Sequence, residues 1–235
     1  MTTPVDASEP SGLAARLSAI DARIAAAAEA AGRDAAEITR IVVTKFHPAS
    51  LVRDLHQLGV RDVGENRQQE LSAKEAELTG LDLRWHFIGQ GQTNKAAAIR
   101  RSADVVHSVD RSRFADALHR AADGDDVLDV LVQINLTDDA GRGGAAPADA
   151  LALAEHVLTL PSLRLRGVMA VAPLDEEPAS AFARLREVAD GVRTVAPSAS
   201  WVSAGMTGDF VEAIAAGATH LRIGSAITGP RPDRG

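Results

Sequence analysis

The stretch TRIVVTKFHPASLVRDLHQLGVRDVGE, residues 39–65, contains the unit on which the fold is built. An apolar, β-branched run at 39–45 is followed by a helical pattern at 49–58 and a second strand pattern at 61–65. Two strands joined through a helix run parallel, because the helix returns the chain to the same end of the sheet. The stretch therefore predicts a strand, a helix and a parallel strand.

The same alternation continues along the chain, and in total eight strands are expected, each separated from the next by a helix. The predicted strands cover 39–45, 61–65, 83–89, 104–109, 127–136, 163–172, 200–204 and 219–225. The predicted helices cover 13–32, 49–58, 67–78, 92–103, 111–122, 147–160, 177–195 and 209–217. Eight parallel strands that are apolar on both faces favour a single closed (β/α)8 TIM barrel.

The order of these elements also predicts the ends of the molecule. A helix at 13–32 precedes the first strand, and we expect this extra helix near the gap that an eighth outer helix would fill. We expect a disordered tail at 1–10, one barrel domain over 11–231 and a short C-terminal tail at 232–235. No change in composition along the chain indicates a second domain.

The alternative fold is an open, doubly wound sheet, and it depends on IGQGQTNK at 88–95. This strand-to-helix turn contains Gly89 and Gly91, with Asp110 downstream, as in a dinucleotide-binding fingerprint. The third glycine of the fingerprint is replaced by Asn94, and the turn follows the third strand instead of the first. We therefore favour a tight turn without a nucleotide role.

Composition limits the classes of function. Of 235 residues, 46% are hydrophobic and 24% charged, which is ordinary for a globular protein, and the absence of Cys favours an intracellular, cytoplasmic protein. The formal charge of -7 argues against nucleic acid as a partner, and no run of about 18 apolar residues suggests a membrane helix. The seven histidines form no H-x-H or H-E-x-x-H pattern, so no metal site is expected.

The chemistry of a parallel barrel lies at the C-terminal ends of its strands. Lys45 ends the first strand among apolar neighbours, which penalise the charged form of a lysine and favour the nucleophilic amine. Such an amine forms a Schiff base with an aldehyde. The alternative interpretation is a lysine that extends from the barrel rim into water.

A phosphate site is expected at the last two strands. RIGSAITG at 222–229 places Gly224 and Ser225 where backbone N–H groups and a hydroxyl bind phosphate, and SAGMTGD at 203–209 adds Ser203 and Thr207. Arg222 alternates with Gly224 and is predicted to face a ring nitrogen or a carboxylate. An aldehyde near lysine together with a phosphate suggests pyridoxal 5′-phosphate (PLP) as the cofactor.

With these segments, the sequence resembles the pyridoxal-phosphate homeostasis proteins, which are similar to the barrel domain of alanine racemase. The matching motifs occur in family order from 38 to 231 and are VVTKFHP, VGENRQQE, WHFIGQGQTNK, HSVDR, VQIN, LRGVMAVAP, SAGMTGDFVEAIAAGATHLRIGSAI and GPR. Departures from the family pattern are Gly91 for Leu, Ala218 for Ser and Thr228 for Phe.

The resemblance implies a role for each motif residue. Lys45 is the Schiff-base lysine and Arg222 faces the pyridine nitrogen. The phosphate is surrounded by Ser203, Met206, Thr207, Gly224 and Ser225, while Asn66 and His86 line the surroundings of the ring. An arginine at the nitrogen disfavours its protonation, whereas most PLP enzymes place a carboxylate there, so the ring is a weaker electron sink.

The composition favours a carrier over an enzyme. The related two-base racemases need a tyrosine from a second domain, and this chain contains no Tyr. His86 is the alternative second base, although a histidine on a barrel strand is more often structural. We expect a monomeric protein that acts in intracellular PLP (vitamin B6) homeostasis without efficient turnover, with PLP-requiring apo-enzymes as candidate recipients. The alternatives are a PLP-dependent enzyme with weak racemase activity and a PLP-free aldolase or phosphate-sugar enzyme.

Overall fold

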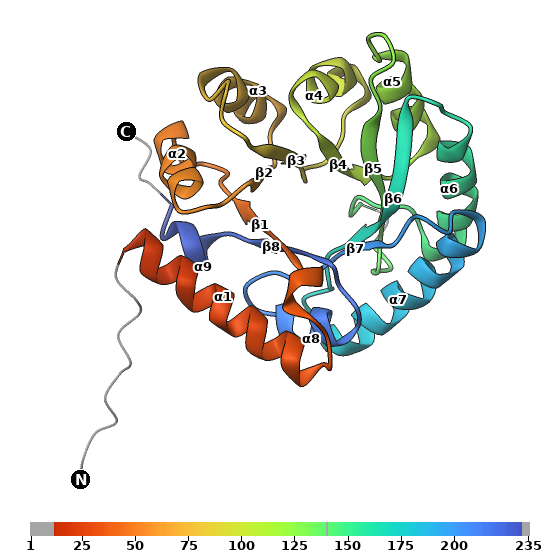
Figure 1. The fold of residues 1–235 in the computed structure, drawn as a ribbon. Helices are drawn as coiled ribbons and strands as arrows, with labels where there is room; N and C mark the ends of the chain where they lie inside the picture. Colours follow the sequence, from red (N-terminus) through yellow and green to blue (C-terminus); the bar gives the residue numbers. More distant parts are fainter. Residues whose placement is uncertain (1–11, 140, 232–235) are drawn as a thin grey trace.

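The computed structural model describes residues 12–139 and 141–231 and contains a closed barrel of eight parallel strands in chain order (Figure 1). The strands are β1 (Thr39–Val43), β2 (Asp62–Glu65), β3 (Arg84–Phe87), β4 (Val105–Val109), β5 (Leu128–Ile134), β6 (Leu163–Ala170), β7 (Trp201–Ser203) and β8 (His220–Ile223). The predicted TIM barrel is confirmed. The open sheet is wrong, because β8 pairs with β1 and leaves no free edge.

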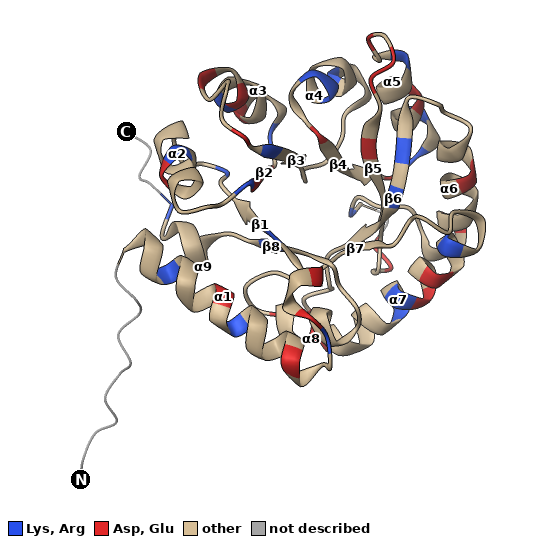
Figure 2. Cartoon of the chain, viewed as in Figure 1, with Lys and Arg blue, Asp and Glu red and all other residues tan. Residues whose placement is uncertain are grey.

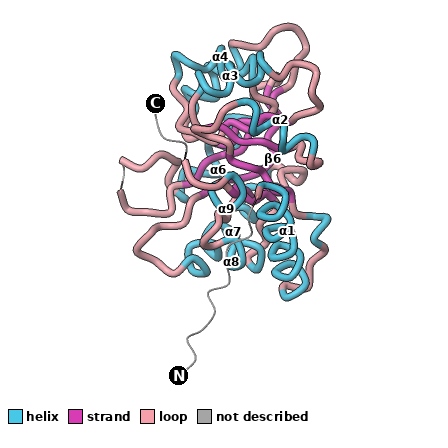
Figure 3. The backbone as a smooth tube through the Cα atoms, turned by 90° about the vertical axis from the view of Figure 1, so that its left-hand side faces the viewer, coloured by secondary structure: helices cyan, strands magenta, loops and turns pink. Residues whose placement is uncertain are grey.

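The helices surround the strands, which lie at the centre of the molecule (Figure 3). They are α1 (Leu13–Ala30), α2 (Ala49–Gln57), α3 (Gln68–Glu77), α4 (Ala96–Ser102), α5 (Ser112–Arg120), α6 (Ala150–Leu158), α7 (Pro178–Val195), α8 (Phe210–Ala215) and α9 (Ser225–Thr228). Three short 3-10 helices are η1 (Ala35–Glu37), η2 (Thr93–Lys95) and η3 (Pro147–Asp149). Each predicted helix is present; α9, a single turn after β8, is an addition that the sequence pattern did not predict.

The extra N-terminal helix lies where it was expected. α1 buries Leu17, Ile20 and Ile24, which recur at the spacing of one helix face, and it packs along α8 and α9 (Figure 1). At its start, Arg16 Nε donates a hydrogen bond to the carbonyl of Ile227 at 2.8 Å. Just after its end, Arg33 donates to the carbonyl of Ala218 at 2.7 Å. The first helix therefore closes the ring of helices beside the last strand.

The turn at 88–95 owes its glycines to packing. A Cβ atom on Gly91 would lie 2.1 Å from the ring of Phe114, a fully buried residue of α5. A Cβ atom on Gly89 would lie 1.8 Å from the carbonyl oxygen of Asn66. The two glycines allow the chain after β3 to pack directly against α5 and against the turn that follows β2.

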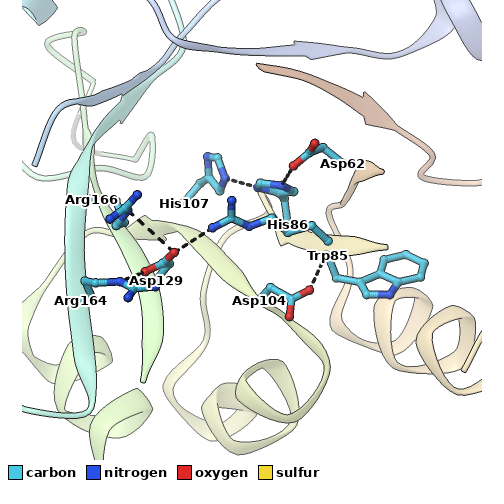
Figure 4. Close-up of polar contacts among 9 residues, drawn as sticks. Asp62, Trp85, His86, Asp104, His107, Asp129, Arg164 and Arg166 are labelled. Atoms are coloured by element: carbon cyan, nitrogen blue, oxygen red, sulfur yellow. Dashed lines mark hydrogen bonds and ion pairs between the residues drawn. The ribbon is translucent and has the colours of Figure 1, made fainter. Parts of the chain in front are cut away.

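Charged side chains close the N-terminal end of the barrel. Asp129 on β5 is buried and forms an ion pair with Arg164 (Figure 4). It forms a second ion pair with Arg84, at 2.8 Å. The guanidinium groups of Arg84 and Arg166 lie 4.9 and 4.3 Å from the centroid of the Trp201 ring. This end is therefore filled by paired charges and an aromatic ring, which leaves the opposite end for a site.

Basic and acidic positions are interspersed along the outer helices (Figure 2). Within 12–139 and 141–231, no helix combines the length and apolar character that crossing a membrane requires. The same ranges hold no cluster of three or more His, Asp or Glu arranged to bind a metal ion. The predicted tails at 1–10 and 232–235 lie outside the described residues.

Candidate functional site

A cavity of about 500 Å³ opens at the C-terminal ends of the strands. It contains seven of the nine residues that the sequence predicted, namely Lys45, Asn66, Met206, Thr207, Arg222, Gly224 and Ser225. Its remaining lining residues are Val43, Phe46, His47, Ile88, Val171, Gly208, Thr228, Gly229 and Arg231. The volume falls within the range of about 300–1,000 Å³ that is usual for small-molecule sites.

Lys45 is the amine of this cavity. It lies two residues beyond the end of β1 and is half-buried. Its Nζ atom lies 5.7 Å from the centroid of the neighbouring Phe46 ring. In the ranges that the structure covers, no ion pair joins Lys45 to a carboxylate, whereas the nearby Lys74 is paired with Glu65 at 2.5 Å. Lys45 therefore remains available for chemistry.

A buried ion pair holds the backbone that carries Lys45. Lys74 donates to the carbonyl of Thr44 at 2.8 Å as well as to Glu65, and the Thr44 hydroxyl donates to the same carboxylate at 2.7 Å. Burial raises the pKa of Glu65, although the charge of Lys74 and its hydrogen bond oppose this shift. The strand end is thus fixed from the side of α3.

Phe46 turns the chain sharply after Lys45. Its φ of 70° lies in the left-handed region, which costs a non-glycine residue about 1–2 kcal/mol. Its N–H donates to Glu70 Oε2 at 2.9 Å, and its ring lies 5.3 and 3.6 Å from the guanidinium carbons of Arg67 and Arg231. Sequence reasoning missed Phe46 and Arg231 as lining residues; the matched motifs VVTKFHP and GPR, which contain them, were the available signal.

Arg222 forms the floor of the cavity and is 5% exposed. It donates to Ser203 Oγ and to the carbonyl of Ala170, both at 2.8 Å. Burial lowers the pKa of Arg222 to about 10, partly offset by Asp209, so the guanidinium is charged at neutral pH. Among the described residues, no carboxylate lies within ion-pair distance of it, which leaves a buried cation beside the cavity.

Backbone amides form part of the cavity wall. Gly205, with φ of 93°, turns the chain after β7, and the N–H of Met206 donates to Asp209 Oδ1 at 2.5 Å. In the described part of the chain, the amides of Thr207, Gly208 and Ser225 have no hydrogen-bond acceptor. All three residues line the cavity, so this wall suits the oxygens of an anion.

His86 and Ser203 are placed below the cavity instead of on its wall. His86 Nε2 lies 2.9 Å from Asp62 Oδ1, and His86 Nδ1 lies 2.9 Å from His107 Nε2 (Figure 4). His107 Nδ1 in turn lies 2.9 Å from Ser203 Oγ. Both predicted residues therefore reach the site through Arg222, because Ser203 accepts its hydrogen bond.

The histidines inside the barrel are held neutral. Burial lowers the pKa of His86, and it lowers that of His107 well below its usual range, where a proton on His86 or His220 would add repulsion. Burial and the neighbouring His86 lower the pKa of His220 to about 3. All three side chains are at most 4% exposed, so the native state resists their protonation.

Acid is therefore expected to destabilise the fold. On unfolding, each histidine regains a pKa near 6.5, so the unfolded chain binds more protons than the native chain as the pH falls below that value. At pH 5.5 the loss is about 1.4 kcal/mol for each histidine that stays neutral, or about 4 kcal/mol for three, relative to pH 7.5. Urea unfolding at both pH values measures it. The His220→Gln variant should show a smaller loss, and an equal loss would contradict this origin.

Known proteins are similar to this chain over almost its whole length. The family model of the alanine racemase N-terminal domain matches residues 15–232. A pyridoxal phosphate homeostasis protein of Pseudomonas aeruginosa is 44% identical over 225 residues, which cover 94% of this chain and 96% of the relative. The chain belongs to the pyridoxal phosphate homeostasis protein family. A further member, from Escherichia coli, is 39% identical over 228 residues, covering 93% of this chain and 97% of the relative.

Solved structures are also similar to this chain. PipY of Synechococcus elongatus has been solved without PLP and with PLP bound; each structure has a TM-score of 0.82 and 34% identity, covering 93% of this chain and all of that one. Alanine racemase of Corynebacterium glutamicum has a TM-score of 0.67 and 15% identity over 90% of this chain, which shows the shared fold alone. The family predicted from the sequence motifs is thus confirmed.

Proposed function

We propose that this protein binds PLP, holds it as a Schiff base on Lys45 and acts in intracellular PLP homeostasis. The observation that carries the proposal is one cavity that combines the available amine of Lys45, the buried cation of Arg222 and three free amides. Relatives that are named pyridoxal phosphate homeostasis proteins, and PipY with PLP bound, support the same assignment.

The residues present fit each chemical group of PLP. Lys45 would hold the aldehyde, while the amides of Thr207, Gly208 and Ser225 would hold the phosphate, with the Thr207 and Ser225 hydroxyls beside them. Arg222 would face the ring nitrogen from the cavity floor, and Asn66, Met206 and Gly224 would complete the walls. When bound, PLP supplies an electrophilic carbon that captures amines.

The positive charge of Arg222 at the cavity floor favours storage of PLP over catalytic turnover. A carboxylate at the ring nitrogen stabilises the protonated ring, which is the strong electron sink of most PLP enzymes. Arg222 remains charged at neutral pH and presents donors only, so it opposes that protonation. The site therefore binds the cofactor without activating it strongly, and this matches a carrier whose recipients are PLP-requiring apo-enzymes. We also propose that the protein acts as a monomer in the cytoplasm.

Titration of the purified protein with PLP tests the proposal directly. We expect a visible absorbance band that saturates near one PLP per chain and that borohydride converts to a permanent adduct on a single tryptic peptide. When an apo-enzyme that requires PLP is added, the absorbance band should decline as PLP is transferred, and the apo-enzyme should become active. A protein that stays colourless with ample PLP would contradict the proposal. A borohydride adduct that forms only when a sugar phosphate is present would support the aldolase interpretation instead.

His47 supports a second candidate function, a PLP-dependent enzyme with weak racemase activity. It lines the cavity near Lys45, and burial together with the charge of Lys74 lowers its pKa, so a neutral imidazole is available as a proton acceptor. His86 lies below the cavity and does not offer this role. Exchange of the α-hydrogen of alanine with deuterated solvent, measured by NMR with the PLP-loaded protein, decides between a carrier and a weak enzyme. Exchange that occurs in the wild type and is lost in His47→Gln would favour the enzyme.

A further inference from the structure

Five side chains form a continuous hydrogen-bond chain through the barrel, from Asp62 to His86, His107, Ser203 and Arg222. Asp62 begins β2 at the N-terminal end of the barrel and is partly exposed, while Arg222 lies at the cavity floor. The three central groups are completely buried. The four contacts of this hydrogen-bond chain measure 2.8 to 2.9 Å, within the normal range for hydrogen bonds. The contacts from Asp62 to His86 and from His86 to His107 are drawn in Figure 4.

The cavity end of this hydrogen-bond chain fixes the direction of its protons. A guanidinium only donates, so Arg222 donates to Ser203 Oγ. The Ser203 hydroxyl is buried, and its remaining contact among the described residues is His107 Nδ1. Ser203 must therefore donate to His107 Nδ1, which leaves the proton of the neutral His107 ring on Nε2. His107 then donates to His86 Nδ1.

The opposite end is consistent with the same direction. Burial raises the pKa of Asp62, but the hydrogen bond to His86, helped by the charge of Arg84, outweighs this and lowers it, so the carboxylate is ionised. An ionised carboxylate only accepts, and His86 therefore donates to it from Nε2. The neutral His86 ring then accepts at Nδ1, as the cavity end already required. Every donor in the chain has its acceptor.

Burial keeps both rings neutral. It is the largest effect on His86 and lowers its pKa, although Asp62 and Asp104 act to raise it, and Arg84 adds to the lowering. Burial lowers the pKa of His107 most, and the charges of Arg222 and Arg84 lower it further; a proton on His86 or His220 would also oppose a second proton on His107. At neutral pH a single pattern of hydrogens thus runs from the arginine to the carboxylate.

We propose that Asp62 is a positioning residue for Arg222 and acts on it through His86, His107 and Ser203. Within the described residues, Arg222 is a buried cation with no carboxylate at ion-pair distance, and Asp62 is the anion at the far end of its hydrogen-bond chain. A chain of hydrogen bonds that all point one way polarises each member, so negative character reaches Ser203 Oγ. Asp62 thereby holds the guanidinium in one orientation from across the barrel.

Nitrogen-15 NMR of the histidine rings tests the proposal in protein without PLP. In the wild type, His86 and His107 should both carry their proton on Nε2 alone at pH 7.5. In Asp62→Ala, His86 loses its acceptor, and we expect mixed tautomers at His86 and also at His107, which Asp62 does not touch. Asp62→Asn should restore the wild-type spectrum, because its amide oxygen still accepts from His86. Asp82→Ala, which removes an exposed carboxylate, is the matched control and should leave both rings unchanged.

PLP binding provides the second measurement, and this step rests on the proposed function. Asp62→Ala should raise the dissociation constant of PLP about tenfold, equivalent to about 1.4 kcal/mol. Asp62→Asn, which keeps orientation but loses charge, should raise it less, and Asp82→Ala should not change it. A His107 spectrum that is unaltered in Asp62→Ala would overturn the positioning role, as would PLP affinity equal to wild type. If the wild type binds no PLP, the proposed function fails, while the ring spectra still decide whether Asp62 controls the chain.

Discussion

Replacement of Lys45 by alanine is expected to abolish the visible absorbance that PLP acquires on binding, at any PLP concentration that saturates the wild type. The reason is chemical, because the band requires a covalent bond between the aldehyde and a protein amine. Absorbance spectroscopy after PLP addition measures the loss, and borohydride reduction followed by mass spectrometry should find no adduct in the variant.

The remaining lysines supply the controls. The chain has three lysines, at 45, 74 and 95. Lys74 is committed to the ion pair with Glu65, and Lys95 lies on η2, outside the cavity. Lys95→Ala should therefore keep the full band. A band of undiminished strength in Lys45→Ala, with its adduct on Lys74 or Lys95, would show that the attachment site has been assigned to the wrong residue.

Gly89→Ala is expected to destabilise the barrel severely. The new Cβ would lie 1.8 Å from the Asn66 carbonyl oxygen, 2.6 Å from its carbonyl carbon and 2.8 Å from its Cα, all backbone atoms that cannot move aside as a side chain does. The turns after β2 and β3 would have to separate, so we expect a loss of about 4 kcal/mol or more in the free energy of unfolding. Urea denaturation followed by circular dichroism measures it.

Gly191 is the matched control for Gly89. It lies inside α7 and has an ordinary φ, and apart from its chain neighbours and the nearby backbone of its own helix, no atom lies within 4 Å of the position of a new Cβ. Gly191→Ala should stabilise the protein by about 0.5–1 kcal/mol, because alanine loses less conformational entropy in a helix. Equal urea midpoints for Gly89→Ala and the wild type would refute the packing argument. Since Asn66 also lines the cavity, a partly folded Gly89→Ala should bind PLP weakly.

The sequence was sufficient for the barrel because eight strand patterns, most of them rich in apolar residues, alternate regularly with helical periods. It also placed Lys45 and Ser225 just beyond strand ends, where both line the cavity, since all strands of a parallel barrel end on one side. Strand lengths were less predictable. The apolar run at 39–45 continues beyond β1, which ends at Val43, because the chain turns away at Phe46.

The sequence pattern could not predict how deep each side chain lies inside the barrel. His86 alternates correctly toward the interior, but its height depends on how β3 is staggered against β2, where His86 pairs with Gly64. That stagger places His86 beside Asp62 and below the cavity. Ser203 was likewise placed by its position at a strand end, yet its hydroxyl contacts His107 and Arg222 inside the barrel. Three-dimensional register, which neighbouring strands determine together, supplied this information.

The pairing of β1 with β8 also has a bearing on synthesis of the protein. Lys45 follows the first strand, Arg222 lies in the last, and Ile41 is in register with Arg222 where the two strands meet. The amine and the cation of the site therefore come together only after the final strand has left the ribosome and the ring has closed. A nascent chain that lacks β8 carries Lys45 without Arg222, so the complete cavity exists only once the barrel has closed.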